Sequence, residues 1–138
     1  MCFMRGVRVA LVTVTVLILA GCTSATSPRV VTSGSYSAVV DAPQSTSGDA
    51  AIAGFLVIDK AGCWSLSQKA GGDPQAIVWP NGTSPVGKKL RIPGIHDPLA
   101  IGTAITGGGG GGPASRSYPP CVAKGQTTTY ISGISLAR

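Results

Sequence analysis

Beyond residue 34 the chain is divided into short apolar stretches by turn-forming residues, and this division restricts the possible folds more than any other feature. The stretches are Ser35–Val40, Ile52–Asp59, Cys63–Ser67, Gln75–Trp79, Lys88–Ile92, Ala100–Thr106 and Thr127–Leu136. Short runs at this spacing, bounded by glycine, proline, asparagine and aspartate, are typical of strands joined by turns. The spacing therefore predicts an all-β domain, either a small barrel or a sandwich.

The composition also favours strands over helices. Glutamate is absent, and leucine, lysine and glutamine are scarce beside glycine, threonine, serine, valine and isoleucine. The scarce residues are good helix formers, whereas valine, isoleucine and threonine favour strands. Two segments read as turns: Asp59–Gly62, where Gly62 can adopt positive φ, and Pro80–Gly82, where an Asn-Gly pair follows a proline.

An unbroken glycine run, Gly107–Gly112, precedes Pro113. A phosphate-binding loop has glycines at set intervals, followed by Lys-Ser or Lys-Thr at the start of a helix. Those elements are missing after this run. We therefore predict a flexible loop here.

The N-terminus has the layout of an export signal. Arg5 and Arg8 precede Val9–Ala20, a run of 12 uncharged residues. A membrane-spanning helix needs roughly 20 apolar residues, so this run is too short for a permanent anchor helix. We expect a cleaved leader.

The four residues Leu19-Ala20-Gly21-Cys22 at the end of this leader resemble the lipobox of bacterial lipoproteins. The resemblance implies cleavage between Gly21 and Cys22 and attachment of fatty acid to Cys22. Two or more acyl chains hold a protein stably on a bilayer. We therefore expect a protein that is lipid-anchored to the extracytoplasmic side of the cell membrane.

Three parts follow from these features. Residues 1–21 are the predicted signal peptide, residues 22–34 the lipidated cysteine and a flexible Ser/Thr-rich tether, and residues 35–138 a single small β-barrel domain. Loss of the two leader arginines would lower the formal net charge of +6, leaving a mildly basic domain. Such a balance suits an anionic partner and equally an ordinary soluble surface.

Cys63 and Cys121 remain in the exported domain, where disulfides persist. A bridge between them would remove about 4 kcal/mol of disorder from the unfolded chain. A redox pair usually has Cys-X-X-Cys spacing, and tetrahedral zinc takes three or four protein ligands. We therefore favour a structural disulfide.

The best candidate for ligand binding combines two tryptophans with a cluster of cations. Trp64 and Trp79 lie in neighbouring predicted strands, and Lys88, Lys89 and Arg91 follow them closely in sequence. Exposed aromatic rings stack on sugars or bases, and the cations would attract an anionic ligand. The same tryptophans also suit a core role, because tryptophan is highly buried on average.

Catalytic and metal-binding patterns are weak. His96, the only histidine, is followed by Asp97 between two prolines, and no Gly-X-Ser-X-Gly element presents a serine nucleophile. Adjacent residues generally point apart, so we expect an exposed loop here. The five aspartates are dispersed and show no ligand spacing. We expect no catalytic residue, no metal and no cofactor.

Several short segments resemble small, uncharacterised lipoprotein domains of high-GC Gram-positive bacteria. The segments are Cys63-Trp64, Ile77–Thr83, Leu99–Gly102 with the glycines that follow, and Pro120-Cys121. The resemblance covers about residues 50 to 122. It implies an OB-like barrel of about five to seven short strands in which Cys63 and Cys121 are bridged. It implies no catalytic residues.

These observations favour a non-enzymatic, lipid-anchored envelope protein that binds a partner protein, a glycan or an anionic polymer. One alternative is an OB-type binder of single-stranded nucleic acid, which we favour less because exported proteins meet little of that ligand. An envelope hydrolase that uses His96 is a third alternative, and it lacks a recognisable nucleophile.

Overall fold

The structure is a computed structural model that describes residues 27–43 and 48–138. The predicted leader, the Gly21–Cys22 cleavage site and the first part of the tether lie outside the described residues. The lipid anchor therefore stays a prediction.

The described chain is all-β, which confirms the predicted class. It forms ten strands, more than the five to seven expected, and no helix among the described residues. The strands are β1 (Arg29–Ser33), β2 (Tyr36–Val40), β3 (Ala50–Ile58), β4 (Trp64–Ser67), β5 (Ile77–Trp79), β6 (Ser84–Val86), β7 (Lys89–Arg91), β8 (Leu99–Ala100), β9 (Ala104–Pro113) and β10 (Thr127–Leu136). Within the described ranges, no helix could cross a bilayer.

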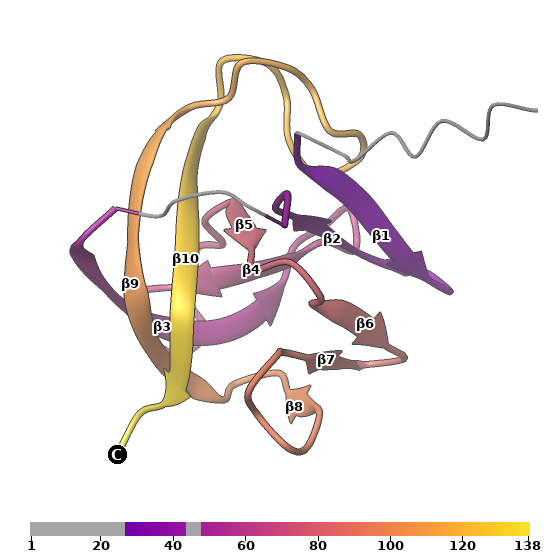
Figure 1. The fold of residues 1–138 in the computed structure, drawn as a ribbon. Coiled ribbons are helices and arrows are strands. Elements are labelled where there is room, and N and C mark those ends of the chain that lie inside the picture. The colour runs from indigo at the N-terminus through magenta and orange to yellow at the C-terminus, as the bar shows by residue number, and fades with distance from the viewer. Residues whose placement is uncertain (1–26, 44–47) are drawn as a thin grey trace, which may run out of the picture.

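Seven strands form one sheet in the order β1-β2-β5-β10-β9-β3-β4, and the long antiparallel pair β9 and β10 lies in its middle (Figure 1). Two isolated bridges bring the β4 end of the sheet back toward its beginning. Ser37 bridges to Cys63, and Leu66 bridges to Gln75. The sheet is therefore curled, with β4 approaching β2 and the residues before β5. Strands β6, β7 and β8 form a separate small sheet.

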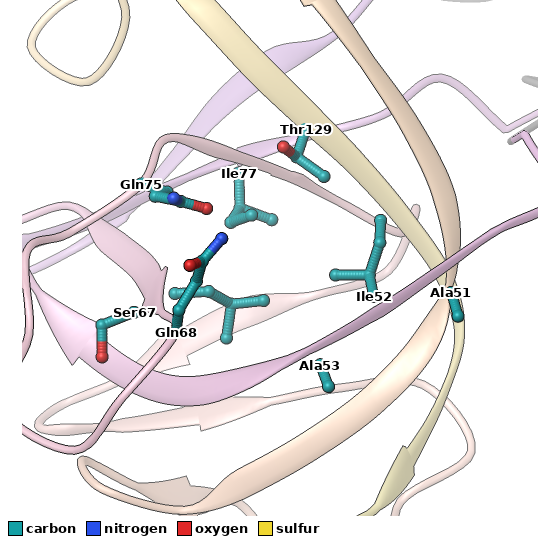
Figure 2. A pocket seen from close by; sticks show the side chains of 9 residues that line it. Ala51, Ile52, Ala53, Ser67, Gln68, Gln75, Ile77 and Thr129 are labelled. Carbon is teal, nitrogen blue, oxygen red and sulfur yellow. The ribbon is translucent and has the colours of Figure 1, made fainter.

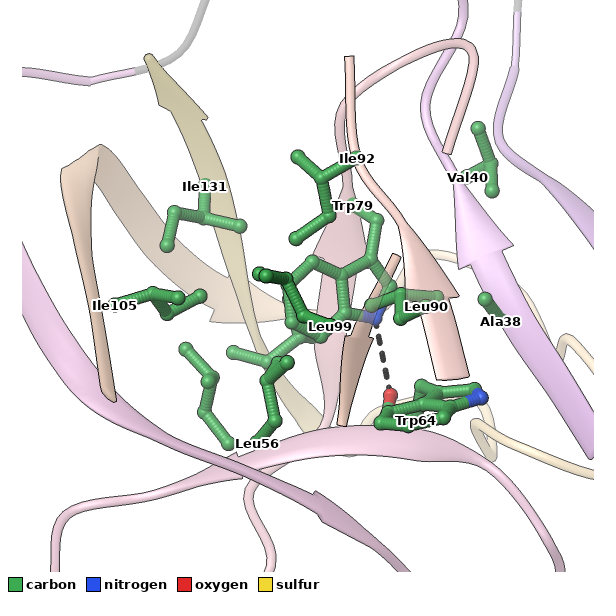
Figure 3. Packing of buried hydrophobic residues seen from close by; sticks show 12 residues of the cluster. Ala38, Val40, Leu56, Trp64, Trp79, Leu90, Ile92, Leu99, Ile105 and Ile131 are labelled. Atoms are coloured by element: carbon green, nitrogen blue, oxygen red, sulfur yellow. Dashed lines mark hydrogen bonds between the residues drawn. The ribbon is translucent and has the colours of Figure 1, made fainter. Parts of the chain in front are cut away.

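The main core lies inside the curled sheet and is centred on Trp79, which is fully buried (Figure 3). Its indole Nε1 donates a hydrogen bond to the backbone oxygen of Trp64, 3.0 Å away. Leu56 and Ile105 contribute from β3 and β9, and Leu90 from the small sheet. The small sheet therefore packs one face onto this core.

Both predicted turns are confirmed. The Asp59 carboxylate accepts hydrogen bonds from the backbone amides of Ala61 and Cys63 at 2.8 and 2.9 Å. Gly62 has φ +85° and closes the hairpin between β3 and β4. In the second turn, the Thr83 amide donates to the Pro80 oxygen at 3.1 Å.

The structure differs from the predicted tether over its last residues. Arg29–Ser33 is strand β1, which pairs along its whole length with β2. Gly34, with φ +60°, takes the first central position of the two-residue turn between them, as a type II′ hairpin turn requires. The ordered domain therefore includes Arg29, and only six residues separate Arg29 from Cys22.

The prediction of a flexible loop at Gly107–Gly112 is wrong. These glycines form the centre of β9, which pairs with β10 along one edge and with β3 along part of the other. A side chain on the inner face would meet backbone: a Cβ at Gly109 would clash with the Tyr130 oxygen, and one at Gly107 would lie 2.7 Å from the Ser132 oxygen. The glycines permit close strand approach, a recognised reason for glycine within a strand.

On the outer face of β9 another glycine backbone lies nearby. The Gly48 Cα would be 3.6 Å from a Cβ at Gly110, and a Cβ at Gly48 itself would lie 2.7 Å from the Gly109 oxygen. The close approach on this outer face therefore depends on glycine at position 48, whereas the approach of β10 depends on glycine at positions 107 and 109.

Candidate functional site

The predicted binding cluster is divided by the fold. Trp64 and Trp79 are 1% and 0% exposed, so neither ring can stack on a ligand. The core interpretation of both residues is confirmed, and the stacking platform is wrong. Burial of large aromatic surface stabilises a small domain strongly, which explains why the fold encloses both rings.

The three cations of that cluster lie on the surface. Lys89 and Arg91 are on the outer face of β7, and Lys88 lies in the turn before it. Strand alternation separates them from Leu90, which is fully buried on the inner face. None of the three cations forms an ion pair with the described part of the chain.

Two exposed aliphatic side chains flank these cations. Val86 lies opposite Lys89 across β6 and β7 and is 44% exposed, and Ile101 follows β8 and is 53% exposed. We call the surface formed by Val86, Lys88, Lys89, Arg91 and Ile101 the hairpin face. It combines positive charge with apolar area, a combination that suits an anionic chain with some apolar surface.

The predicted disulfide is confirmed by an S–S distance of 2.04 Å between Cys63 and Cys121. It joins the start of β4 to the loop between β9 and β10, residues 114–126. That loop covers a second buried cluster on the outer face of the main sheet. The cluster contains Val39, Val78, Ala114, Tyr118 and Val122.

A cavity of about 200 Å³ opens between β3, β4, β5 and β10 (Figure 2). Ile52 and Ile77 form apolar parts of its wall, and the amide groups of Gln68 and Gln75 reach toward each other across it. No charged side chain lines this cavity. It can hold a small neutral group that accepts and donates hydrogen bonds, such as part of a sugar.

His96 lies in an exposed loop, as expected. Its Nδ1 is 3.0 Å from the Asp97 carboxylate, and the two side chains are 97% and 86% exposed. The expectation that these neighbours point apart is wrong, since they contact each other. In a catalytic triad the aspartate that orients the histidine is buried, whereas this pair is open to solvent. No group of metal ligands occurs within residues 27–43 and 48–138.

One phenol on the outer face of the sheet has a perturbed acidity. Burial raises the pKa of Tyr130 above its usual value of about 10, and the nearby Tyr118 and Asp41 raise it further. The folded state therefore keeps this proton at a pH where the unfolded chain releases it. Tyr130 lies beside the glycines of β9, opposite Gly110.

This difference predicts how stability depends on alkaline pH. Below about pH 10 the Tyr130 contribution is complete, and it is lost as pH rises through the folded-state pKa. We expect Tyr130→Phe to reduce the fall in the free energy of unfolding between about pH 8 and pH 11. Denaturant titrations of both proteins at each pH would measure this. An identical fall in the two proteins would contradict the prediction.

Sequence patterns missed the cavity residues and the exposed aliphatic pair. Gln68 lies just beyond the end of one predicted strand and Gln75 is the first residue of the next, and polar residues are ordinary at both positions. Val86 and Ile101 next to turns would have been a usable signal, because an apolar residue in a turn has no core to enter.

No protein-family model, no curated protein and no solved structure matches this chain.

Proposed function

We propose that this chain is a lipid-anchored, extracytoplasmic binding module without enzymatic activity, and that its hairpin face holds an anionic polymer of the cell envelope. The observation that carries the proposal is the position of Lys88, Lys89 and Arg91. They stand together on one exposed face without acidic partners in the described chain. Three unpaired cations in a row attract a polyanion.

Two features support export and anchoring. Leu19-Ala20-Gly21-Cys22 matches a lipobox in sequence. The Cys63–Cys121 disulfide suits an oxidising compartment outside the cytosol. Both features bear on where the protein is located and say nothing about which ligand it binds.

We also propose that the curled main sheet is an OB-like barrel. The bridges Ser37↔Cys63 and Leu66↔Gln75 support this arrangement, because they join the last strand of the sheet to its early part. In that architecture, ligands bind the outer surface of strands and the loops beside them. Single-stranded nucleic acid becomes a weaker candidate, because both tryptophans needed for base stacking are buried.

The hairpin face can be tested with a triple substitution. We expect Lys88→Gln, Lys89→Gln and Arg91→Gln together to weaken binding of linear polyphosphate by about two orders of magnitude, at about 1 kcal/mol for each cation. Binding of the unsubstituted protein should also weaken as salt rises, because ions screen exposed charges. Isothermal titration calorimetry at two salt concentrations would measure both effects.

A matched control removes three exposed cations from other parts of the chain, Lys60, Lys69 and Arg138, by substitution with glutamine. This control has the same net charge as the hairpin variant, and we expect it to keep polyphosphate binding. Equal loss of binding in both variants would mean that net charge alone is responsible and would contradict the proposed face. Unchanged polyphosphate binding in the hairpin variant would also contradict it.

A further inference from the structure

We propose that the end of the domain nearest the lipid anchor is a second membrane contact, in which Arg29, Arg116 and Lys124 face anionic lipid headgroups. This inference rests on the anchor in the proposed function. It adds an orientation: the 114–126 loop lies toward the bilayer, and the hairpin face is left free for ligand.

The three cations come from two segments that the fold brings together. Within the loop, the Lys124 amide donates to Ser117 Oγ at 3.0 Å, which places Lys124 close to Arg116. Val30 of β1 packs against the cluster that the loop covers, which brings the start of β1 beside the loop. Strand alternation puts Arg29 on the opposite face of β1 from Val30, at the exposed end of an edge strand, so it adds charge at the rim of the loop. Figure 1 shows the loop bending toward the start of β1.

The loop is positively charged and rigidly held. Residues 113–126 contain Arg116 and Lys124 and no acidic residue. At the base of the loop, the Ala114 amide donates to the Gln126 oxygen at 2.9 Å, and the Ala114 oxygen accepts from the Gly125 amide at 2.8 Å. The Cys121 disulfide fixes the far side of the loop. Arg29, Arg116 and Lys124 are all exposed. The nearby acid, Asp41, is 9% exposed, so it presents little charge to solvent.

The length of chain before β1 brings this end within reach of the membrane. Six residues lie between Cys22 and Arg29, and an extended chain spans at most about 3.5 Å per residue, roughly 25 Å in all. A lipid on Cys22 would therefore hold the loop near the surface. Tethering makes a second contact intramolecular, so weak electrostatic attraction is sufficient. Anionic membranes attract basic groups that lie within about a Debye length, near 10 Å.

The two groups of cations lie at different ends of the molecule. In Figure 1 the loop is at the top, and the small sheet that carries Lys88 and Lys89 is at the lower right. The two groups can therefore be tested independently, with one triple variant for each group.

The experiment uses the lipidated protein in vesicles of neutral lipid and in vesicles with added anionic lipid. Intact mass spectrometry first establishes the lipid on Cys22. Peptide-level hydrogen exchange then measures residues 115–125 and, as an internal reference, residues 84–91. We expect exchange in the loop to slow by on the order of tenfold on the anionic vesicles, with no change in the hairpin.

The variants separate the possible outcomes. Substitution of Arg29, Arg116 and Lys124 by glutamine should abolish the protection, and substitution of Lys88, Lys89 and Arg91 should leave it intact. If a lipidated protein shows equal loop exchange on both kinds of vesicle, the orientation is wrong and the anchor stands. If exchange slows in residues 84–91 and not in the loop, the hairpin face is the one that lies toward the bilayer, and the proposed orientation is wrong. An unmodified Cys22 overturns both the anchor and this inference.

Discussion

Gly109→Ala is expected to destabilise the domain by about 3 kcal/mol or more, because the added methyl group has no space. Its Cβ would clash with the backbone oxygen of Tyr130 on β10 and would lie 2.5 Å from Ile52 Cδ1. The first obstacle is backbone, so it cannot be relieved by a side-chain rotation. β9 and β10 would have to separate, and their ladder of hydrogen bonds at the centre of the sheet would weaken.

Gly112→Ala is the matched control in the same glycine run. No atom lies within 4 Å of a Cβ at this position, and Gly112 is not among the glycines with positive φ. Alanine here should be neutral or should stabilise by about 0.4–1 kcal/mol, since it restricts the unfolded chain. Denaturant unfolding of the two variants measures the difference. Equal effects of the two substitutions would contradict the packing described for β9.

Strands with apolar side chains and turns with characteristic residues could be predicted from the sequence. Strand stretches with apolar side chains were predicted well, because burial of one or both faces leaves a readable pattern. Ala100–Thr106 was only partly right: the chain turns after Ala100 and re-enters the sheet at Ala104. The turns at Gly62 and Pro80 were also readable, because their residues have local conformational preferences.

The errors at β1 and β9 have different physical causes. The glycine strand β9 is specified by its partners, because glycine disfavours strands in isolation and the close approach of β10 overrides that preference. Strand β1 contains Val30, Val31 and Thr32, which favour strands, and both valines pack against buried clusters. This signal was overlooked because the segment continues a Ser/Thr-rich stretch. The short strand β6 (Ser84–Val86) was not predicted either.

The candidate site was predicted only in part. Sequence alone located the cations Lys88, Lys89 and Arg91; in the structure Lys89 and Arg91 share the exposed face of β7, and Lys88 lies exposed in the turn before it. Sequence could not decide whether Trp64 and Trp79 are exposed, since both roles use the same residue type. The packing of Val30 against the cluster under the 114–126 loop was also hidden, because it depends on a contact between distant parts of the chain.

Replacing both Cys63 and Cys121 with alanine is expected to reduce the free energy of unfolding by about 4 kcal/mol. The bridge joins residues 58 positions apart, and closing a loop of that length removes about this much disorder from the unfolded chain. The loss is large for a small domain, whose total stability is commonly about 5–15 kcal/mol. Alanine is preferred to serine because Cys63 is 2% exposed, and a buried hydroxyl would add its own penalty.

The effect should be strongest in the loop that the bridge holds. In the cysteine variant, the backbone hydrogen bonds at its base and the contact with Val39 and Val78 still hold the 114–126 loop on the sheet. Denaturant unfolding measures the total loss, and hydrogen exchange of the Tyr118 and Val122 amides measures loop opening. Ala123→Ser, an exposed change in the same loop, is the control and should be nearly neutral. A loss below about 1 kcal/mol in the cysteine variant would mean that packing of the loop, and not the covalent bridge, holds it on the sheet.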